Sequence, residues 1–463
     1  MRRCIKRLYV RWISWCGLSV NRSIFGAALS IAMITLVVRA LSVGKDMAVA
    51  SAFGIGDSLD IFLMACVLPA FAISVFAGSF YSSFIPVLIS VREEHGHAAA
   101  KKLFSSVTLI ALAVLGAVTV IFSVTNEWLI KMLAAGFSPS KLENTINVFD
   151  QMLPLILIGG MALFGGAVLN AQKKFSLVAV APILTPVVII LLLYVFANGS
   201  GNPELLVMGT LSGAFFELCI IVWGLNRAGY VCLPIWHGLD NNSRKVITQY
   251  LPMIGGAFLM SGTVMVDQVM AAWLESGSVS ALSFAIKVPA LVTGLAAAGL
   301  GAAVLPYLSQ QIAEADYRGL RDTLTKYSKL IVVISLPLTS IGLCFSEPLV
   351  ELLFERGSFS REDTMLVSEV MRYSLLQVPF YILGILFARY VSVMSGNRFL
   401  LYVAILNLLL NVILNIILMR IIGVAGIALS TAAVYIVSTT SLYWIVKYQM
   451  KKLEDDGRKS LEI

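Results

Sequence analysis

Five ionisable residues interrupt stretches of the sequence that are otherwise apolar. Arg39, Lys45 and Asp46 lie towards the end of the first apolar run, Asp60 opens the second, and Lys287 lies within ALSFAIKVPAL. Arg offers a planar fork and Lys a compact point charge, and both bind phosphate or pyrophosphate groups. Because an ionisable group inside a membrane costs at least about 2.5–3.5 kcal/mol, these residues are candidates for substrate binding. In the alternative interpretation, Lys45, Asp46 and Asp60 only mark helix ends at the membrane surface.

A second group of polar residues has the composition of a site for a small cation. Asp267 lies within GTVMVDQVMAAW, Asn407, Asn411 and Asn415 recur every four residues, and Thr431 lies in the next apolar run. Carboxylate, amide and hydroxyl oxygens suit Na⁺, and the carboxylate is also an acceptor for H⁺. We therefore expect no resident cofactor but a coupling ion, Na⁺ or H⁺. The alternative is a ladder of Asn side chains that hydrogen-bond between helices.

The remaining charges and the cysteines indicate no chemistry of their own. Glu217 in GAFFELCII has no evident partner in the sequence, and Arg389 is close enough to a helix end to extend towards the membrane surface. The six cysteines form no CxxC pair, which argues against a zinc site or a disulfide framework. No P-loop, HExxH, GxSxG or kinase motif occurs, so we expect a protein that is not an enzyme.

The elements that must position these residues are membrane-spanning helices. Hydrophobic residues make up 59% of the 463-residue chain and charged residues 13%, with a mean hydropathy of +0.88. Soluble domains are about 45–50% apolar and about 25% charged, so a cytosolic enzyme, a secreted domain and a disordered chain are excluded. We predict an all-α polytopic membrane protein of about twelve transmembrane helices, at residues 22–44, 60–91, 103–124, 148–170, 177–198, 204–226, 245–272, 278–308, 325–345, 366–394, 398–419 and 423–447.

Basic residues are distributed unevenly among the loops. About 24 of the 34 Lys and Arg fall on the side shared by both termini, against roughly 7 on the other side. This bias predicts a multi-pass protein of the bacterial cytoplasmic membrane with both termini in the cytoplasm, and it argues against a nucleic-acid partner. Residues 1–21 form a basic amphipathic segment suited to anionic membrane lipids, and residues 448–463 form a polar cytoplasmic tail.

The sequence contains two similar halves. LPAFAISVFAGSFYSSFIP (68–86) and VPALVTGLAAAGLGAAVLP (288–306) each place two prolines 17 residues apart, and GFS at 136–138 is matched by GSFS at 357–360. Since six helices per half is an even number, the halves share one orientation and are related by an axis along the membrane normal. The pattern is typical of a transporter and predicts a central cavity between two parallel six-helix lobes, residues 22–235 and 236–447.

Several stretches resemble one known family of membrane proteins. The sequence from Arg39 through VGKDMAVASAFGIGDSLDIFLMACVLPAF to FIPVL, and later SGSVSALSFAIKVPALVTGL, AVLPYLSQQ and ERGSFSRED, look like stretches of MurJ/MviN proteins. These are lipid II flippases of the multidrug/oligosaccharidyl-lipid/polysaccharide (MOP) exporter superfamily. The resemblance covers nearly the whole chain. It implies V-shaped lobes, as in the related MATE transporters, that work by alternating access.

The resemblance also implies roles for particular residues. The family's essential cationic positions match Arg39 and, with Lys in place of Arg, Lys45 and Lys287, and its acidic positions match Asp46 and Asp60. The implied cargo is an undecaprenyl-pyrophosphate-linked glycan, and the implied protein partners are cell-envelope synthases.

This sequence departs from the family pattern at two of its implied sites. An arginine expected in the second helix is absent, and Ser74 stands near its position. The sodium site described for some members would fall on Asp267, Asn407, Asn411 and Thr431, where Asn411 replaces a common Asp.

These observations predict a flippase that moves a polyprenyl-pyrophosphate-linked saccharide across the cytoplasmic membrane. The cargo would be a lipid II-like peptidoglycan precursor. Family members usually have fourteen helices and this sequence shows about twelve, so a related exopolysaccharide or O-antigen unit stays open. Two other functions remain as alternatives. One is a cation-coupled multidrug exporter of the same superfamily, and the other is a non-transporting membrane scaffold for glycan assembly.

Overall fold

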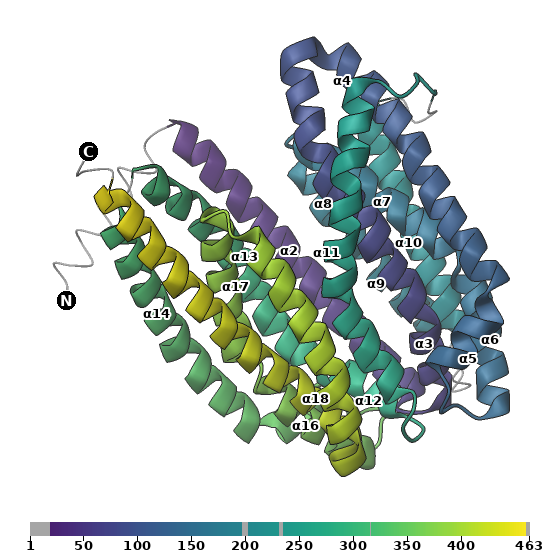
Figure 1. Ribbon diagram of the computed structural model, residues 1–463. Helices are drawn as coiled ribbons and strands as arrows, with labels where there is room; N and C mark the ends of the chain where they lie inside the picture. The colour runs from purple at the N-terminus through teal and green to yellow at the C-terminus, as the bar shows by residue number, and fades with distance from the viewer. Residues whose placement is uncertain (1–18, 197–201, 231–234, 315, 460–463) are drawn as a thin grey trace.

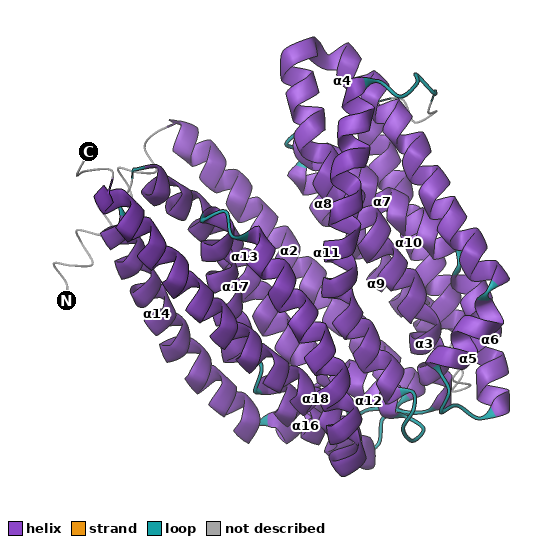
Figure 2. Ribbon diagram, viewed as in Figure 1, coloured by secondary structure: helices purple, strands orange, loops and turns teal. Residues whose placement is uncertain are grey.

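The predicted all-α architecture is confirmed. The computed structural model describes residues 19–196, 202–230, 235–314 and 316–459, which form helices joined by short connections and contain no strand (Figure 2). Nine helical stretches in this part of the chain are long and apolar enough to cross a membrane. Two of them are interrupted by non-helical backbone, at Gly96 and at Ile422–Gly423. Together with the 35-residue helix α2, they account for the twelve predicted spans.

The first half of the chain supplies an N-lobe. Its first helix, α2 (Ser19–Phe53), ends at Gly54, which has a φ of 61°. The elements that follow are α3 (Asp57–Ala72), the π-helix η1 (Ile73–Ala77), α4 (Gly78–Val124), α5 (Asn126–Leu133), α6 (Pro139–Met152), α7 (Pro154–Ala171), α8 (Phe175–Val180), the 3₁₀-helix η2 (Ala181–Ile183), α9 (Leu184–Phe196) and α10 (Glu204–Arg227).

The second half supplies a C-lobe. Figure 1 shows the two lobes close together near α12 and further apart towards the end where both termini lie. Residues 1–18 of the predicted amphipathic segment and 460–463 of the predicted tail lie outside the described residues. The elements of this half are α11 (Asn241–Ala271), α12 (Ser278–Ala285), α13 (Lys287–Ala313), α14 (Tyr317–Cys344), α15 (Ser346–Phe354), α16 (Arg361–Leu375), α17 (Val378–Val393) and α18 (Asn397–Lys459).

Three of the predicted spans are divided into shorter helical segments, and each has a proline near the start of its last segment. Pro186, Pro289 and Pro379 lie in the first turns of α9, α13 and α17. Proline is tolerated there because the first N–H groups of a helix have no partner within it. The break before α13 makes Lys287 the first residue of that helix, which places its side chain at a helix end within the span.

Helix α11 packs against both lobes. In its first half, Tyr250 stacks on Phe80 of α4 with ring centroids 3.9 Å apart, and the Tyr250 hydroxyl donates to the carbonyl of Phe76 over 3.3 Å. In its second half, Gly262 faces Leu408 of α18 at van der Waals distance. The helix that opens the second half of the sequence therefore crosses between the lobes, and the domain boundary at 235/236 stays a prediction.

The matched loops of the two halves make matching contacts at the end remote from the termini. Gly357 packs so tightly on Ser51 of α2 that a Cβ would clash with the Ser51 carbonyl, and Ser358 N donates to that carbonyl over 2.8 Å. Likewise, a Cβ at Gly136 would lie 2.5 Å from the carbonyl oxygen of Ala272, at the end of α11. Each loop thus packs on the first helix of the other half, which joins the lobes at this end.

Candidate functional site

Three of the predicted substrate-binding residues come together between the lobes. Lys45 Nζ lies 3.0 Å from Asp46 Oδ1, and Lys287 Nζ lies 3.3 Å from the same oxygen. Lys45 and Asp46 belong to α2, whereas Lys287 opens α13 in the other half of the chain. One carboxylate oxygen therefore holds two ammonium groups, one from each half, and all three side chains retain some exposure.

Arg39 extends this cationic group along α13. It is exposed, and one nitrogen of its guanidinium lies 3.6 Å from the Cβ position of Gly294. Gly294 is seven residues from Lys287, hence on the same face of α13 two turns further along. Three cations with a single carboxylate leave a net positive charge, which favours a polyanion that is withdrawn from bulk water.

The structure does not bring Asp60 into this group. The Asp60 side chain is fully buried at the end where the lobes meet, and it accepts from the backbone N–H groups of Gly277 (2.7 Å) and Ser280 (2.8 Å). Those donors belong to the first turn of α12, so an N-lobe carboxylate occupies the positive end of a C-lobe helix. Asp60 has the environment of a structural contact between the lobes.

Lys141 completes this contact, and reasoning from the sequence missed it. Its ammonium lies 2.8 Å from Asp60 Oδ2 and 2.6 Å from Asp57 Oδ1, and its side chain is 7% exposed. Lys141 belongs to the polar stretch PSKLENTINVFDQM, which forms the amphipathic helix α6. Such a stretch has the composition of a solvated loop, so only its packing against α3 reveals the role.

The predicted cation group is assembled around Asp267. Asn411 Nδ2 and Asn415 Nδ2 donate to Asp267 Oδ1 over 2.9 and 2.8 Å, and Thr431 Oγ1 donates to Oδ2 over 2.9 Å. Asn407 lies apart, because its amide donates to Ser438 over 3.0 Å. Asn415, the third member of the Asn stripe, is therefore the one that contacts the carboxylate together with Asn411.

The donor set around Asp267 fits a small monovalent cation. Asn415 Oδ1 has no hydrogen-bond partner among the described residues, so rotation of this amide would turn an uncharged oxygen towards the carboxylate without breaking another hydrogen bond of that oxygen. No group of three or more His, Cys, Asp or Glu within the described residues lies close enough to hold a metal ion. A single carboxylate with amide and hydroxyl oxygens matches a weakly charged hard cation better than a transition metal.

The two remaining predicted charges lie outside both groups. Glu217 is partly buried on α10, and within the described part of the chain it makes no hydrogen bond or ion pair. Arg389 is exposed on the last turns of α17, as expected for a side chain that extends to the membrane surface.

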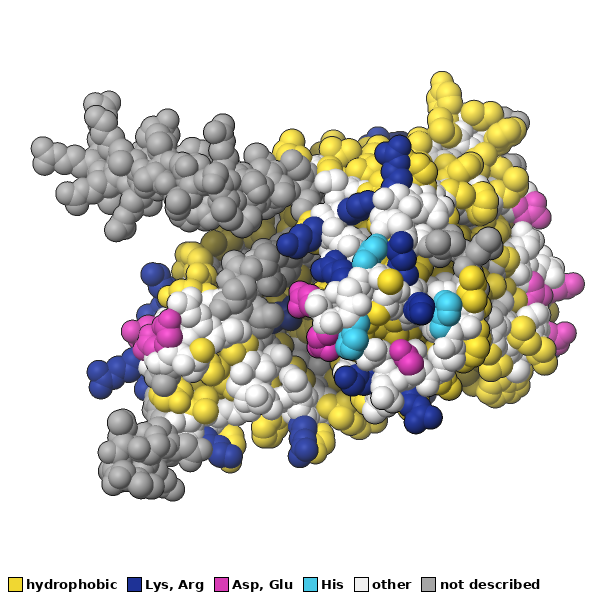
Figure 3. Space-filling view, turned by 90° about the horizontal axis from the view of Figure 1, so that it is seen from above, with side chains coloured by type: hydrophobic (Ala, Val, Ile, Leu, Met, Phe, Trp, Pro, Cys, Tyr) yellow, Lys and Arg dark blue, Asp and Glu magenta, His cyan; other side chains and the backbone are white. Residues whose placement is uncertain are grey.

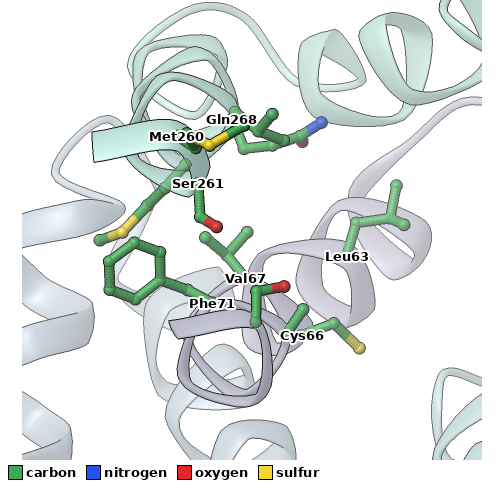
Figure 4. A pocket seen from close by; sticks show the side chains of 11 residues that line it. Leu63, Cys66, Val67, Phe71, Met260, Ser261 and Gln268 are labelled. Carbon is green, nitrogen blue, oxygen red and sulfur yellow. The ribbon is translucent and has the colours of Figure 1, made fainter. Parts of the chain in front are cut away.

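A cavity of about 390 Å³ lies between α3 and α11, the two helices that face each other across the lobes. Figure 4 shows Phe71 and Met260 on one side of this pocket and Leu63 and the amide of Gln268 on the other. Ser74, which stands near the expected second-helix arginine, lines it too. The wall is therefore mainly apolar, with Ser74, Ser261 and Gln268 as its polar groups.

The two helical lobes, the central cavity and the charges that meet between the lobes define a transporter of the MOP type. The chain belongs to the lipid II flippase MurJ family, whose model matches residues 49–460. A probable lipid II flippase MurJ from Vibrio cholerae serotype O1 is 25% identical over 445 residues, which cover 92% of this chain and 83% of the relative. A second, from Synechocystis sp., is 24% identical over 451 residues, or 94% of this chain and 84% of the relative.

Solved structures show the same fold. A lipid II flippase MurJ in an inward closed conformation has a TM-score of 0.78 and 22% identity, and the match covers 91% of this chain and 89% of that one. An inward-facing multidrug resistance MATE family transporter has a TM-score of 0.75 at 15% identity, over 92% of this chain and 99% of that one. Both likenesses confirm the predicted superfamily fold.

Proposed function

We propose that this chain flips lipid II, a polyprenyl-pyrophosphate-linked saccharide, from the cytoplasmic to the periplasmic leaflet. The observation that carries the proposal is the meeting of Lys45 and Lys287, from opposite halves, on one oxygen of Asp46. A pyrophosphate carries more charge than one carboxylate and offers more acceptor oxygens. It therefore replaces Asp46 as the partner of both lysines, with Arg39 adding a planar fork.

This binding mode supports transport by alternating access. An anion held by Lys45 of the N-lobe and Lys287 of the C-lobe bridges the lobes, and its binding favours a conformation in which the two lysines stay close. Opening at the other end separates the lysines, which weakens their joint hold on the anion, and the cargo leaves. The return to the present conformation lets Asp46 recover both lysines. The cycle needs no covalent chemistry, in keeping with a protein that is not an enzyme.

The termini are proposed to face the cytoplasm. Figure 3 shows Lys, Arg and His side chains on the face at the terminus-bearing end, in keeping with the bias of basic residues to cytoplasmic loops. The lobes are apart at this end, so the conformation is one that admits cargo from the cytoplasm. Basic residues here also suit contacts with anionic lipids and cell-envelope synthases.

A monovalent cation at Asp267 is proposed to drive the return step. Asp267 and Thr431 would hold it with the amide oxygens of Asn411 and Asn415. The ion would supply a positive charge to balance the Asp267 carboxylate. Within the described residues Asp267 forms no salt bridge, so its partners are neutral donors that can rearrange around a cation.

The test is binding of undecaprenyl-pyrophosphate lipids to the purified protein by native mass spectrometry. We expect Arg39→Ala and Lys287→Ala each to weaken binding about ten-fold or more, since hydrogen bonds to charged groups contribute about 1.5–3 kcal/mol. The matched control is Lys131→Ala, which removes an exposed lysine paired with Glu127. Preference for lipid II over a peptide-free lipid-linked glycan would identify the headgroup.

Binding that is indifferent to both substitutions would contradict the proposed cargo site. Efflux of cationic dyes that depends on Asp267 and not on Arg39 would instead establish the cation-coupled exporter. Flipping that survives neutralisation of all the cavity charges would point to the scaffold alternative.

A further inference from the structure

A second cavity lies inside the C-lobe, next to the Asp267 group. It has a volume of about 190 Å³, enough for several water molecules, and α11, α12, α13, α16, α17 and α18 contribute to its wall or its rim. Its wall is mixed, with six polar side chains among thirteen lining residues, against three among eleven in the larger central cavity. The polar side chains that line it include Asp267, Gln268, Thr293, Ser374, Gln377 and Thr431.

Two of these side chains have buried oxygen atoms without a protein partner. Ser374 is 1% exposed, and its Oγ makes no hydrogen bond, and Gln268 Oε1 is likewise buried and unpaired. Buried polar atoms are nearly always hydrogen-bonded, to protein or to ordered water. A polar occupant of this cavity, beside Asp267, would offer partners to these two oxygen atoms.

Within the part of the chain that the structure describes, two residues line both cavities. Val264 and Gln268, one turn apart on α11, lie between the central cavity and the smaller chamber. Gln268 is also the neighbour of Asp267 along the chain. In Figure 4 its amide lies at the edge of the central pocket, on the same side as Leu63, which belongs to the end where the lobes meet. The polar end of this side chain thus stands where the two cavities approach each other.

Another wall of the chamber is formed by α13, the helix that carries Lys287. Ile286, Ala290 and Thr293 line the chamber, whereas the adjoining residues Lys287 and Gly294 face Asp46 and Arg39. The same two turns of α13 therefore place Lys287 and the cation chamber on adjoining sides of one helix.

We propose that this chamber is the route by which a hydrated monovalent cation exchanges between Asp267 and the central cavity, with Gln268 as the polar partition. The inference rests on the proposed cation coupling at Asp267. It adds that, in this conformation, the cation leaves into the apolar cavity between α3 and α11. Gln268 is then a positioning residue of the ion path, and the occupant of the chamber is a cation with its water.

The experiment measures exchange of ²²Na⁺ from the purified full-length protein, at constant ionic strength maintained with choline chloride. Ala290→Leu narrows the chamber and leaves Asp267, Asn411, Asn415 and Thr431 unchanged in the sequence, and we expect exchange to slow at least ten-fold. Gln268→Ala removes the partition and should speed exchange. The matched control is Ala298→Leu, an exposed site two turns further along α13 that does not line the chamber, and its rate should equal that of the wild type.

The outcomes distinguish a failure of the proposed route through the chamber from a failure of the proposed cation site at Asp267. If exchange in Ala290→Leu matches the wild type, or if Ala298→Leu slows it equally, the proposed route through the chamber is wrong. The proposed cation site at Asp267 is not contradicted by that result. Binding of ²²Na⁺ that survives Asp267→Asn, or is absent from the wild type, overturns the cation coupling itself and the chamber with it. Retained binding of the pyrophosphate lipid shows that the Ala290→Leu protein is folded.

Discussion

Two lysine–carboxylate groups join the halves of this molecule, and they differ in burial. At the end where the lobes meet, Asp60 is 0% exposed and Lys141 7% exposed, and backbone N–H groups of α12 complete the contact. Between the lobes, Asp46 is 14% exposed and Lys287 37%, and among the described residues only lysines hold the carboxylate. The residue types are the same in both places.

The difference shows which charges can change partner. Asp60 accepts from Lys141 of α6 and from two backbone N–H groups at the start of α12, and removing it from them would leave a charge buried in a medium of low polarity. Asp46 is accessible, so water or an incoming anion can take over either lysine at modest cost. The buried group therefore fixes how the lobes meet, whereas the accessible group is suited to exchange its carboxylate for cargo.

Breaking the buried group should have the largest effect. Lys141→Met leaves Asp60 with an uncompensated charge, which costs about 3–5 kcal/mol when one partner of a buried pair is removed. We expect a large drop in the free energy of unfolding, measured by denaturation of the purified protein in detergent.

The double variant Asp60→Asn/Lys141→Met serves as the control for that change. It removes both charges, so it should recover most of the stability that Lys141→Met loses. A double variant no more stable than the single one would show that Lys141 contributes through packing instead of charge.

Changing the accessible group should affect binding more than stability. Asp46→Asn keeps the shape and removes the competitor for Lys45 and Lys287, so the affinity for a pyrophosphate lipid should rise by up to about five-fold, the equivalent of an exposed ion pair. Native mass spectrometry or equilibrium binding measures the change, and Glu127→Gln is the control at an exposed pair. Weaker binding by Asp46→Asn would mean that Asp46 positions the lysines for the cargo.

The smallest effect is expected at a third group, on the surface between α15 and α16. Glu355 accepts a 2.7 Å hydrogen bond from Thr364, and this bond, together with Arg361, holds the pKa of the carboxyl below its usual 4.5. A lowered pKa stabilises the fold above pH 4.5, and that contribution is lost as the pH falls through the lowered pKa.

Thermal unfolding of Thr364→Val between pH 7 and pH 3 tests this contribution. The variant should unfold at a lower Tm than the wild type at pH 7, with a smaller drop than Lys141→Met, and the difference should narrow at the acid end. Thr364→Ser keeps the hydroxyl and should behave as the wild type. A difference independent of pH would assign the role of Thr364 to its bond with the Ser360 carbonyl.

Much of the architecture was predictable because it depends on local composition. Span length and apolarity follow from the thickness of the membrane, and the paired motifs at 136–138 and 357–360 indicate the repeat before any contact is known. The sequence also marks Asp267 and Lys287 as unusual, since charges are rare in such surroundings. Their roles in binding stay predictions.

The contact partners of these side chains could not be predicted from the sequence. They depend on how the helices pack and on how far each helix is shifted along its neighbour. The Asn stripe puts three amides on one face of α18, and the position of α11 along that face decides that Asn411 and Asn415 contact Asp267 while Asn407 does not. The sequence does not distinguish the role of Asp46 from that of Asp60, and no sequence pattern marks Lys141 or Gln268 as functional.

The sequence by itself determined a helical membrane protein of two related halves, since hydropathy and repeats are properties of the chain. Only the tertiary structure decided which charges are buried and which are free to exchange, since burial depends on the packing of helices that are distant in the sequence.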